Sequence, residues 1–187
     1  VGASIMPMST GVIAMGTACV STANDIDKAV NSYLTATGTA TNEAEKFKDI
    51  MNGIYSNNYG DSFEDIADAM AKVKANISDI DDSQLQEVTE SALTLRDVFN
   101  YDVAESTRSV STLMEQFGIT ANEAYDLIAQ GAQNGLDYSG ELLDSIDEYS
   151  VQFAKVGMDA EDMFSIFANG AENGAFNLDK IGDAVKE

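Results

Sequence analysis

Residues 117–135, FGITANEAYDLIAQGAQNG, are matched by residues 156–174, VGMDAEDMFSIFANGAENG. One constant offset, that from Gly118 to Gly157, aligns the two stretches. The residues that recur identically at this offset are Gly118, Ala121, Ala129, Gly131, Ala132, Asn134, Gly135, Asp144 and Glu148, which recur as Gly157, Ala160, Ala168, Gly170, Ala171, Asn173, Gly174, Asp183 and Glu187. Such periods are typical of proteins that stack similar structural units. We therefore expect residues 118–156 and 157–187 to form two successive units.

Glycines divide each unit into a short helix, a corner and a longer helix. Gly131 and Gly170 fall inside helical patterns, where glycine costs about 1 kcal/mol relative to alanine. We expect a close backbone contact or a left-handed corner to offset that cost, and left-handed helix ends at Gly135 and Gly174. No run of alternating β-branched residues is present. The predicted fold is all-α, built from stacked helical hairpins with an approximate 39-residue repeat and glycine corners.

Apolar residues at helical spacing also predict helices upstream, over roughly residues 47–55, 63–77, 85–99 and 103–117. The stretch FEDIADAM at 63–70 is a fainter version of LDKIGDAV at 178–185. We divide the chain into two parts. Residues 1–42 form a helical segment and loop that opens with uncharged, apolar and small residues. Residues 43–187 form an acidic α-helical repeat domain.

Residues 1–23, VGASIMPMSTGVIAMGTACVSTA, carry no charge. Thr10, Ala14 and Ala18 lie four apart, as on a close helix–helix contact. The composition favours a helix packed against protein over membrane insertion, which rewards Leu, Ile and Phe far more. Both alternatives stay open. The chain starts at Val1 and ends inside a helical pattern, so we expect it to be a fragment of a longer protein.

The net charge of −22 argues against nucleic-acid binding. Lysine and arginine number only ten and are scattered, so no basic stripe is available to neutralise phosphates. Among the acids, only Asp25 and Asp27 precede Glu43. We therefore predict no direct binding of duplex DNA.

The absence of histidine limits the chemistry further. Cys19 is the single cysteine, so no internal disulfide can form, and no histidine is present to activate its thiol. Papain-type catalysis and zinc peptidase chemistry are excluded for the same reason.

The stretch SDIDDSQLQEVTE at 78–90 imitates a calcium-binding loop. Asp79, Asp81, Ser83 and Glu90 occupy ligand positions 1, 3, 5 and 12 of that motif. Gln84, however, stands where the sharp turn requires glycine. We interpret the stretch as a polar loop in which Asp82 or Ser83 caps the next helix.

Two Glu-Ser pairs, Glu90-Ser91 and Glu105-Ser106, are of the kind that lytic transglycosylases carry, with the glutamate as acid. The glycine-rich, methionine-containing stretch that accompanies the pair in those enzymes is missing here. We expect both pairs to face solvent. The sequence therefore predicts no catalytic residue, no cofactor-binding residue and no metal ligand.

The order of these patterns resembles a known family. Residues 7–51, PMSTGVIAMGTACVSTANDIDKAVNSYLTATGTATNEAEKFKDIM, resemble the N-terminal helical region of tape measure proteins of tailed phages and prophages. The stretches DLIAQGAQNGLDYSGELLDSIDEYSVQFAKVGMDAEDMF and GAENGAFNLDKIGDAVKE resemble the part that follows in that family. The long coiled coil and C-terminal regions of the family are missing here.

The resemblance implies a virion structural protein of the phage tail, and the missing catalytic residues predict that it is not an enzyme. A tape measure protein lies in the lumen of the tail tube, sets tube length during assembly in the host cytoplasm, and is released ahead of the DNA on ejection. Implied partners are tail tube proteins, tail tip or baseplate proteins and tail assembly chaperones, with self-association in the tube. Two alternatives remain: a fragment of a cell-wall (peptidoglycan) hydrolase, and a generic acidic α-helical adaptor module.

Overall fold

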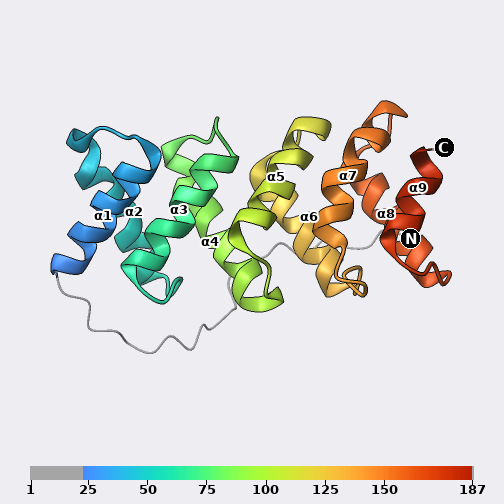
Figure 1. The fold of residues 1–187 in the computed structure, drawn as a ribbon, viewed down its shortest axis with the longest axis horizontal. Coiled ribbons are helices and arrows are strands. Elements are labelled where there is room, and N and C mark those ends of the chain that lie inside the picture. Colours follow the sequence, from blue (N-terminus) through green and yellow to red (C-terminus); the bar gives the residue numbers. More distant parts are fainter. Residues whose placement is uncertain (1–22, 187) are drawn as a thin grey trace. The chain divides into compact units, whose positions relative to one another are not determined.

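The structure, a computed structural model, describes residues 23–186, and these residues contain helices and no strand. The predicted all-α fold is therefore confirmed (Figure 1). The α-helices are α1 (Ala23–Thr37), α2 (Ala44–Ser56), α3 (Phe63–Asn76), α4 (Asp82–Phe99), α5 (Val103–Phe117), α6 (Ala121–Gln133), α7 (Leu142–Lys155), α8 (Ala160–Glu172) and α9 (Leu178–Lys186). A 3-10 turn, Thr41–Glu43, precedes α2. The small residues Thr10, Ala14 and Ala18 lie outside the described residues, as does about half of the predicted segment 1–42.

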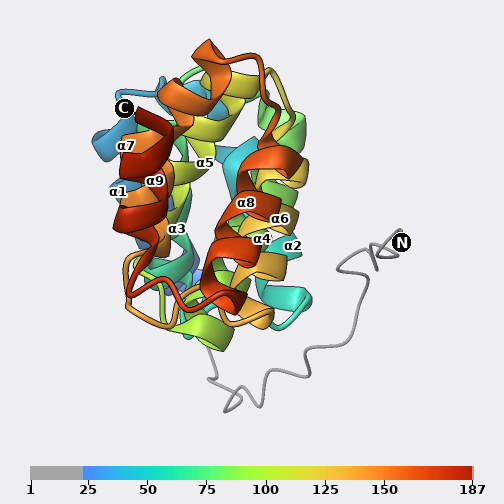
Figure 2. The same ribbon diagram turned by 90° about the vertical axis from the view of Figure 1, so that its right-hand side faces the viewer.

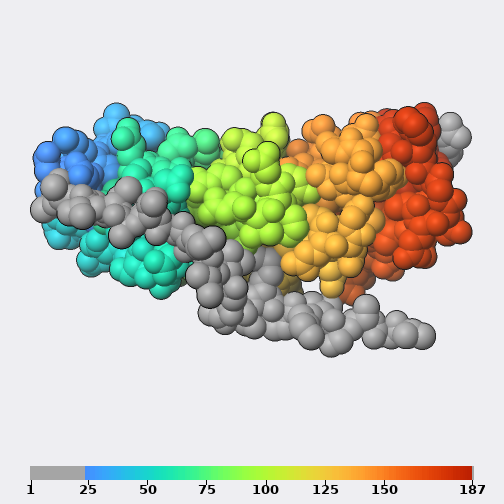
Figure 3. Space-filling view, turned by 90° about the horizontal axis from the view of Figure 1, so that it is seen from below, coloured from blue at the N-terminus to red at the C-terminus, as the bar shows by residue number. Residues whose placement is uncertain are grey.

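The helices form two compact units, one ending at Val103 and the other beginning at Ala104. In the first unit, α1 packs on α3 in one layer and α2 on α4 in the other (Figure 2). In the second unit, α7 packs on α9 and α6 on α8. The main contacts thus join helices no more than two places apart along the chain. Side chains fill the gaps that the ribbons leave between neighbouring helices of each unit (Figure 3).

The core of the first unit forms where the apolar stripes of its helices meet. Met51, Ile54, Ile66 and Met70 have no exposed surface, and the ring centroids of Tyr33 and Phe47 lie 4.7 Å apart. Burial raises the pKa of the Tyr33 hydroxyl to about 12. Each helix alone would expose its stripe, so the four helices depend on one another.

Charged side chains join three helices at one edge of this unit. Asp82, the first residue of α4, accepts hydrogen bonds from Lys46 on α2 and Lys74 on α3, the latter at 3.3 Å. Lys74 also donates to the backbone carbonyl of Ile80 at 2.8 Å. These two lysines lower the pKa of Asp82. The carboxylate therefore links the start of α4 to both preceding helices.

Two hydrogen-bonded helix starts recur in the second unit. Thr120 and Glu123 form a reciprocal capping box at the start of α6, and Asp159 and Asp162 form the equivalent one at the start of α8. Each satisfies backbone N–H groups that a helix start leaves without partners. The two pairs occupy equivalent positions of the sequence repeat, so the same local device begins both short helices.

The helix ends also recur. Gly135 and Gly174 have φ of 76° and 85°, which confirms the predicted left-handed conformation at both. After each helix a backbone N–H closes onto the corner glycine: Leu136 donates to the carbonyl of Gly131 at 2.9 Å, and Ala175 donates to that of Gly170 at 3.0 Å. Superposition of the two whole hairpins stays a prediction.

The expectation for Gly131 and Gly170 was wrong in its details. Both lie within α6 and α8 and neither is left-handed. Their close neighbours are side chains, not backbone: a Cβ on Gly131 would lie 2.9 Å from Cε1 of Phe164, and one on Gly170 would lie 2.7 Å from Cγ1 of Ile181. The missing Cβ thus makes room for an apolar side chain of a later helix.

We expect Gly182→Ala to be the more damaging of two mid-helix glycine substitutions. Its Cβ would overlap the buried ring of Tyr149 on α7 and force α7 and α9 apart. Overpacking of this kind costs about 1–3 kcal/mol of unfolding free energy. Gly53→Ala is the matched control, because its neighbour is the long side chain of Gln86, which can move away. The control should gain up to about 1 kcal/mol from helix propensity. Equal melting temperatures for the two variants would contradict this.

We expect Asp82→Asn to lower the unfolding free energy by roughly 1 kcal/mol at pH 7. The folded-state pKa of Asp82 is lowered, so its contribution is present above the unfolded pKa of about 4 and is lost as the pH falls through the folded value. The difference between parent and variant should therefore shrink below about pH 4. Urea titrations at several pH values measure it. Asp68→Asn, which removes a single pair with Lys72, should cost less. A difference that is constant with pH would refute the linkage.

Candidate functional site

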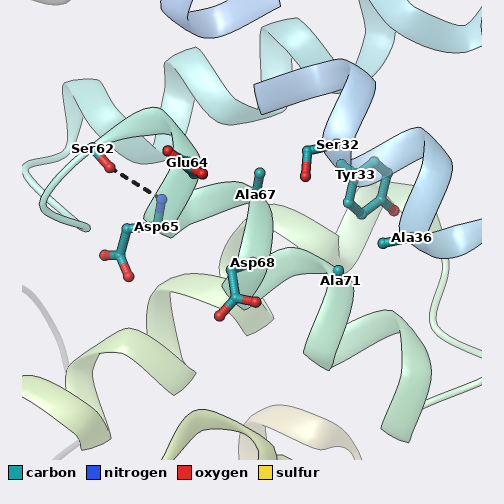
Figure 4. Close-up of a pocket in the computed structure, with 9 residues that line it drawn as sticks. All are labelled: Ser32, Tyr33, Ala36, Ser62, Glu64, Asp65, Ala67, Asp68 and Ala71. Atoms are coloured by element: carbon teal, nitrogen blue, oxygen red, sulfur yellow. Dashed lines mark hydrogen bonds between the residues drawn. The ribbon is translucent and has the colours of Figure 1, made fainter. Parts of the chain in front are cut away.

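A surface hollow of about 440 Å³ lies between α1 and α3 in the first unit (Figure 4). Its lining residues are Ser32, Tyr33 and Ala36 from α1, with Ser62, Glu64, Asp65, Ala67, Asp68 and Ala71 from the start and body of α3. Its lining combines three acidic side chains with hydroxyl groups and alanines.

Several polar groups of this hollow are already engaged in interactions within the protein. Asp65 accepts from Arg96 Nη1 of α4 at 2.7 Å and from the backbone N–H of Asp61 at 3.0 Å. Asp68 pairs with Lys72 at 3.0 Å. Ser62 caps α3, because its hydroxyl accepts the backbone N–H of Asp65 at 3.2 Å. The lining residues do not include a nucleophile with an adjacent base, so the hollow has no recognisable catalytic arrangement.

The residues of the calcium-like stretch are not arranged as a binding loop. Asp79 and Asp81 precede α4, whereas Ser83 and Glu90 lie on α4 almost two turns apart. Glu90 accepts from Asn57 and from Gln86, both at 2.9 Å. Within residues 23–186, no group of three or more acidic, histidine or cysteine side chains is placed to hold a metal ion.

The helix cap predicted within this stretch was wrong. The helix begins at Asp82 and is preceded by Asp81, whose side chain makes no capping hydrogen bond. Asp82 instead pairs with the two lysines described above. The Asp82 side chain, which the sequence predicted to cap the start of α4, therefore binds lysines of α2 and α3 instead.

The two Glu-Ser pairs differ in their surroundings, and the expectation that both face solvent was only partly right. Glu105 is exposed, but Ser106 beside it is fully buried on α5. Glu90 is half-buried, and Ser91 donates to the backbone carbonyl of Glu87 at 3.1 Å. Neither pair lines the hollow.

Glycines allow close contacts between the stacked helices of the second unit. Phe164 on α8 reaches the space left by Gly131 on α6, and Tyr149 on α7 reaches the space left by Gly182 on α9. The Tyr149 hydroxyl also lies 2.6 Å from Asp179 and 3.0 Å from Asp183, both on α9. Burial and these neighbouring carboxylates raise the pKa of that hydroxyl.

Sequence reasoning missed the contact between Gly182 and Tyr149. The available signal was a glycine within the helical pattern LDKIGDAVKE, where glycine requires a packing reason. Comparison of the two repeat units did not reveal this contact, because the residue equivalent to Gly182 in the preceding unit is Leu143 and not a glycine.

Nine of the ten lysine and arginine side chains, all of them within the described residues, pair with an acidic side chain. They are Lys28, Lys46, Lys48, Lys72, Lys74, Arg96, Arg108, Lys180 and Lys186. The cations are thus neutralised locally while most of the 32 acids remain in excess. Such a surface repels phosphate backbones. None of the described helices combines the length and apolarity needed to cross a membrane.

Comparisons with known proteins point to one class of protein. The sequence profile of the family described as phage-related minor tail protein matches residues 55–187. A protein of Streptomyces phage phiC31, described as a probable tape measure protein, is 34% identical over 65 residues. That match covers 34% of this chain and 9% of the phage protein, so the chain spans only a small part of the relative's length. No solved structure matches the chain.

Proposed function

Because this chain belongs to the phage-related minor tail protein family, we propose that it is a structural segment of a tape measure protein. The observation that carries the proposal is the family match over residues 55–187, joined by the similarity to a probable tape measure protein. A role as a structural component of the phage tail follows from the family itself. The finer role is to lie in the lumen of the tail tube, help set its length, and leave it on DNA ejection.

The chain is proposed to be a fragment of a longer protein. The alignment with the phage relative covers only 9% of that protein, so a similar protein places such a segment within a much longer polypeptide. We expect these helices to belong to stacked hairpins, which extend by adding units. Further length outside this segment is therefore compatible with its architecture.

The proposed partners are tail tube proteins, tail tip or baseplate proteins and tail assembly chaperones, with self-association in the tube. The acidic surface supports a lumen component that does not grip the genome. Its cations are nearly all paired among the described residues, so few remain to release counterions from duplex DNA.

The segment is proposed to be non-enzymatic. The alternative of a peptidoglycan hydrolase would need a glutamic acid at a substrate groove, with its pKa raised to act as a general acid. Glu90 is instead held by two amide donors, from Asn57 and Gln86. Neither Glu90 nor Glu105 borders the hollow between α1 and α3. The adaptor alternative lacks a specific observation in its favour.

We expect the purified chain to release no soluble muropeptides from peptidoglycan. The physical reason is that Glu90 is engaged by the side-chain amides of Asn57 and Gln86, and that neither glutamate borders the hollow between α1 and α3. The measurement is turbidity clearing and fragment analysis, with lysozyme as positive control. Clearing that is abolished by Glu90→Gln or Glu105→Gln would overturn the non-enzymatic assignment.

The length-setting role predicts that deleting residues 118–156 from the protein in its phage shortens the tail. This deletion joins Phe117 to Gly157 and so keeps the register of the repeat. The expected shortening lies between about 10 Å, the thickness of one stacked hairpin, and about 60 Å, the length of the deleted segment as one continuous helix. Electron microscopy of many tails measures the mean length.

The control for this deletion is Glu90→Gln, which keeps the number of residues and should leave tail length unchanged. Normal tail length in the deletion phage would show that this segment does not set length. A shortening near the lower limit would indicate that the hairpins stay stacked inside the tube, and one near the upper limit that they open.

A further inference from the structure

The α8–α9 hairpin leaves uncovered a set of positions that are buried in the α6–α7 hairpin. Ala129, Gly131, Leu142 and Ile146 are buried. Their counterparts in the next repeat unit are each only half-buried, and they are Ala168, Gly170, Ile181 and Val185. All eight are small or apolar. We call the four half-buried residues the receiving face.

The covered hairpin shows directly what fills such a face. Gly131 is met by the ring of Phe164, which comes from α8, the helix stacked on α6. At the receiving face, Ile181 of the same hairpin lies against Gly170 instead. In the α6–α7 hairpin, the space at Gly131 holds the ring of Phe164 from the next hairpin. In the α8–α9 hairpin, the equivalent space at Gly170 is partly filled by Ile181 of the same hairpin.

The first described helix presents the contrasting pattern. In α1, the large apolar residues Ile26, Val30, Tyr33 and Leu34 are all buried. Its exposed residues include Asp25, Asp27, Lys28 and Asn31. Terminal units of stacked-repeat proteins need such a polar outer face for solubility. The α8–α9 hairpin instead keeps Ile181 and Val185 partly exposed, and Phe176 in its connecting loop is 87% exposed.

We propose that the receiving face is covered by a further helical hairpin of the longer polypeptide, whose inward surface follows the α8–α9 pattern. This rests on the proposed function, in which the chain is one segment of a longer tail protein. The hairpin is expected to present an aromatic side chain to Gly170, as Phe164 does to Gly131. It is also expected to turn Ile181 away from that glycine.

A second copy of the chain fits this face less well. The surface complementary to the receiving face is the inward side of a hairpin such as α8–α9, with Phe164 on it. In every copy that side is already buried against α6, where Phe164 meets Gly131. The geometry therefore favours a new hairpin over dimerisation.

The repeat itself supplies the probe. Glu148 and Glu187 are equivalent, so appending a copy of residues 149–187 after Glu187 adds one repeat unit in register. This extends α9 to the position equivalent to the end of α7 and adds one hairpin. The matched control is the same elongated chain with the appended counterpart of Phe164 changed to Asp, which extends α9 equally but places a charge against Gly170.

In the elongated chain, we expect amide hydrogen exchange in α8 and α9 to slow by about tenfold or more relative to the control. The Cδ1 methyl resonance of Ile181 should also shift, because an aromatic ring arrives beside it. A second variant tests the same contact from the other side. Ala168→Glu should be tolerated in the parent chain but should cancel the protection in the elongated chain.

Equal exchange rates in the elongated chain and its control would overturn the proposal. So would concentration-dependent dimerisation of the parent that protects α8 and α9, because a second copy would then be the occupant. These outcomes are separable from the proposed function. If tail length shortens with the deletion but hydrogen exchange shows no docking, the tape measure role stands and only the docking proposal fails. If docking is observed but tail length is normal, only the tape measure role fails.

Discussion

The structure depends on the fact that none of its described helical hairpins can bury its own apolar face. Each described helix is amphipathic and at most 18 residues long, and isolated helices of this length are marginal in water. Stacking provides the missing cover, and particularly close contacts occur where glycine lets a side chain approach a helix backbone. Phe164 against Gly131 and Tyr149 against Gly182 are the clearest instances. Both fix the distance between stacked helices more tightly than general apolar contact would.

Local signals in the sequence were sufficient for the helices and many of their ends. The fold class followed from apolar spacing, and the left-handed conformations at Gly135 and Gly174 followed from glycine placed just after a helical pattern. Side-chain partners distant in sequence were not accessible in this way. Gly131 meets Phe164, which lies two helices later, and the repeat indicates only that two glycines are equivalent, not what lies against them. Asp82 likewise was predicted from its neighbours as a cap, whereas its partners Lys46 and Lys74 lie on other helices.

The candidate site likewise combines features that the sequence predicts with features that depend on how the helices pack. The composition alone excluded histidine-dependent chemistry, and the hollow between α1 and α3 adds polar groups that are already engaged in interactions within the protein. Placing Ser106 in the interior, next to an exposed Glu105, required the packing of α5 to be known. The family match then gave a biological setting that neither charge nor helical spacing contains.

The restriction of the main contacts to helices no more than two places apart has a mechanical consequence. A chain held together this way has no single tie that must break before the rest can yield. Tension applied at one end would detach neighbouring helices in sequence, and the polypeptide would lengthen in steps. Relaxation would allow each step to reverse, because a released hairpin finds its docking surface on the neighbour that remains folded.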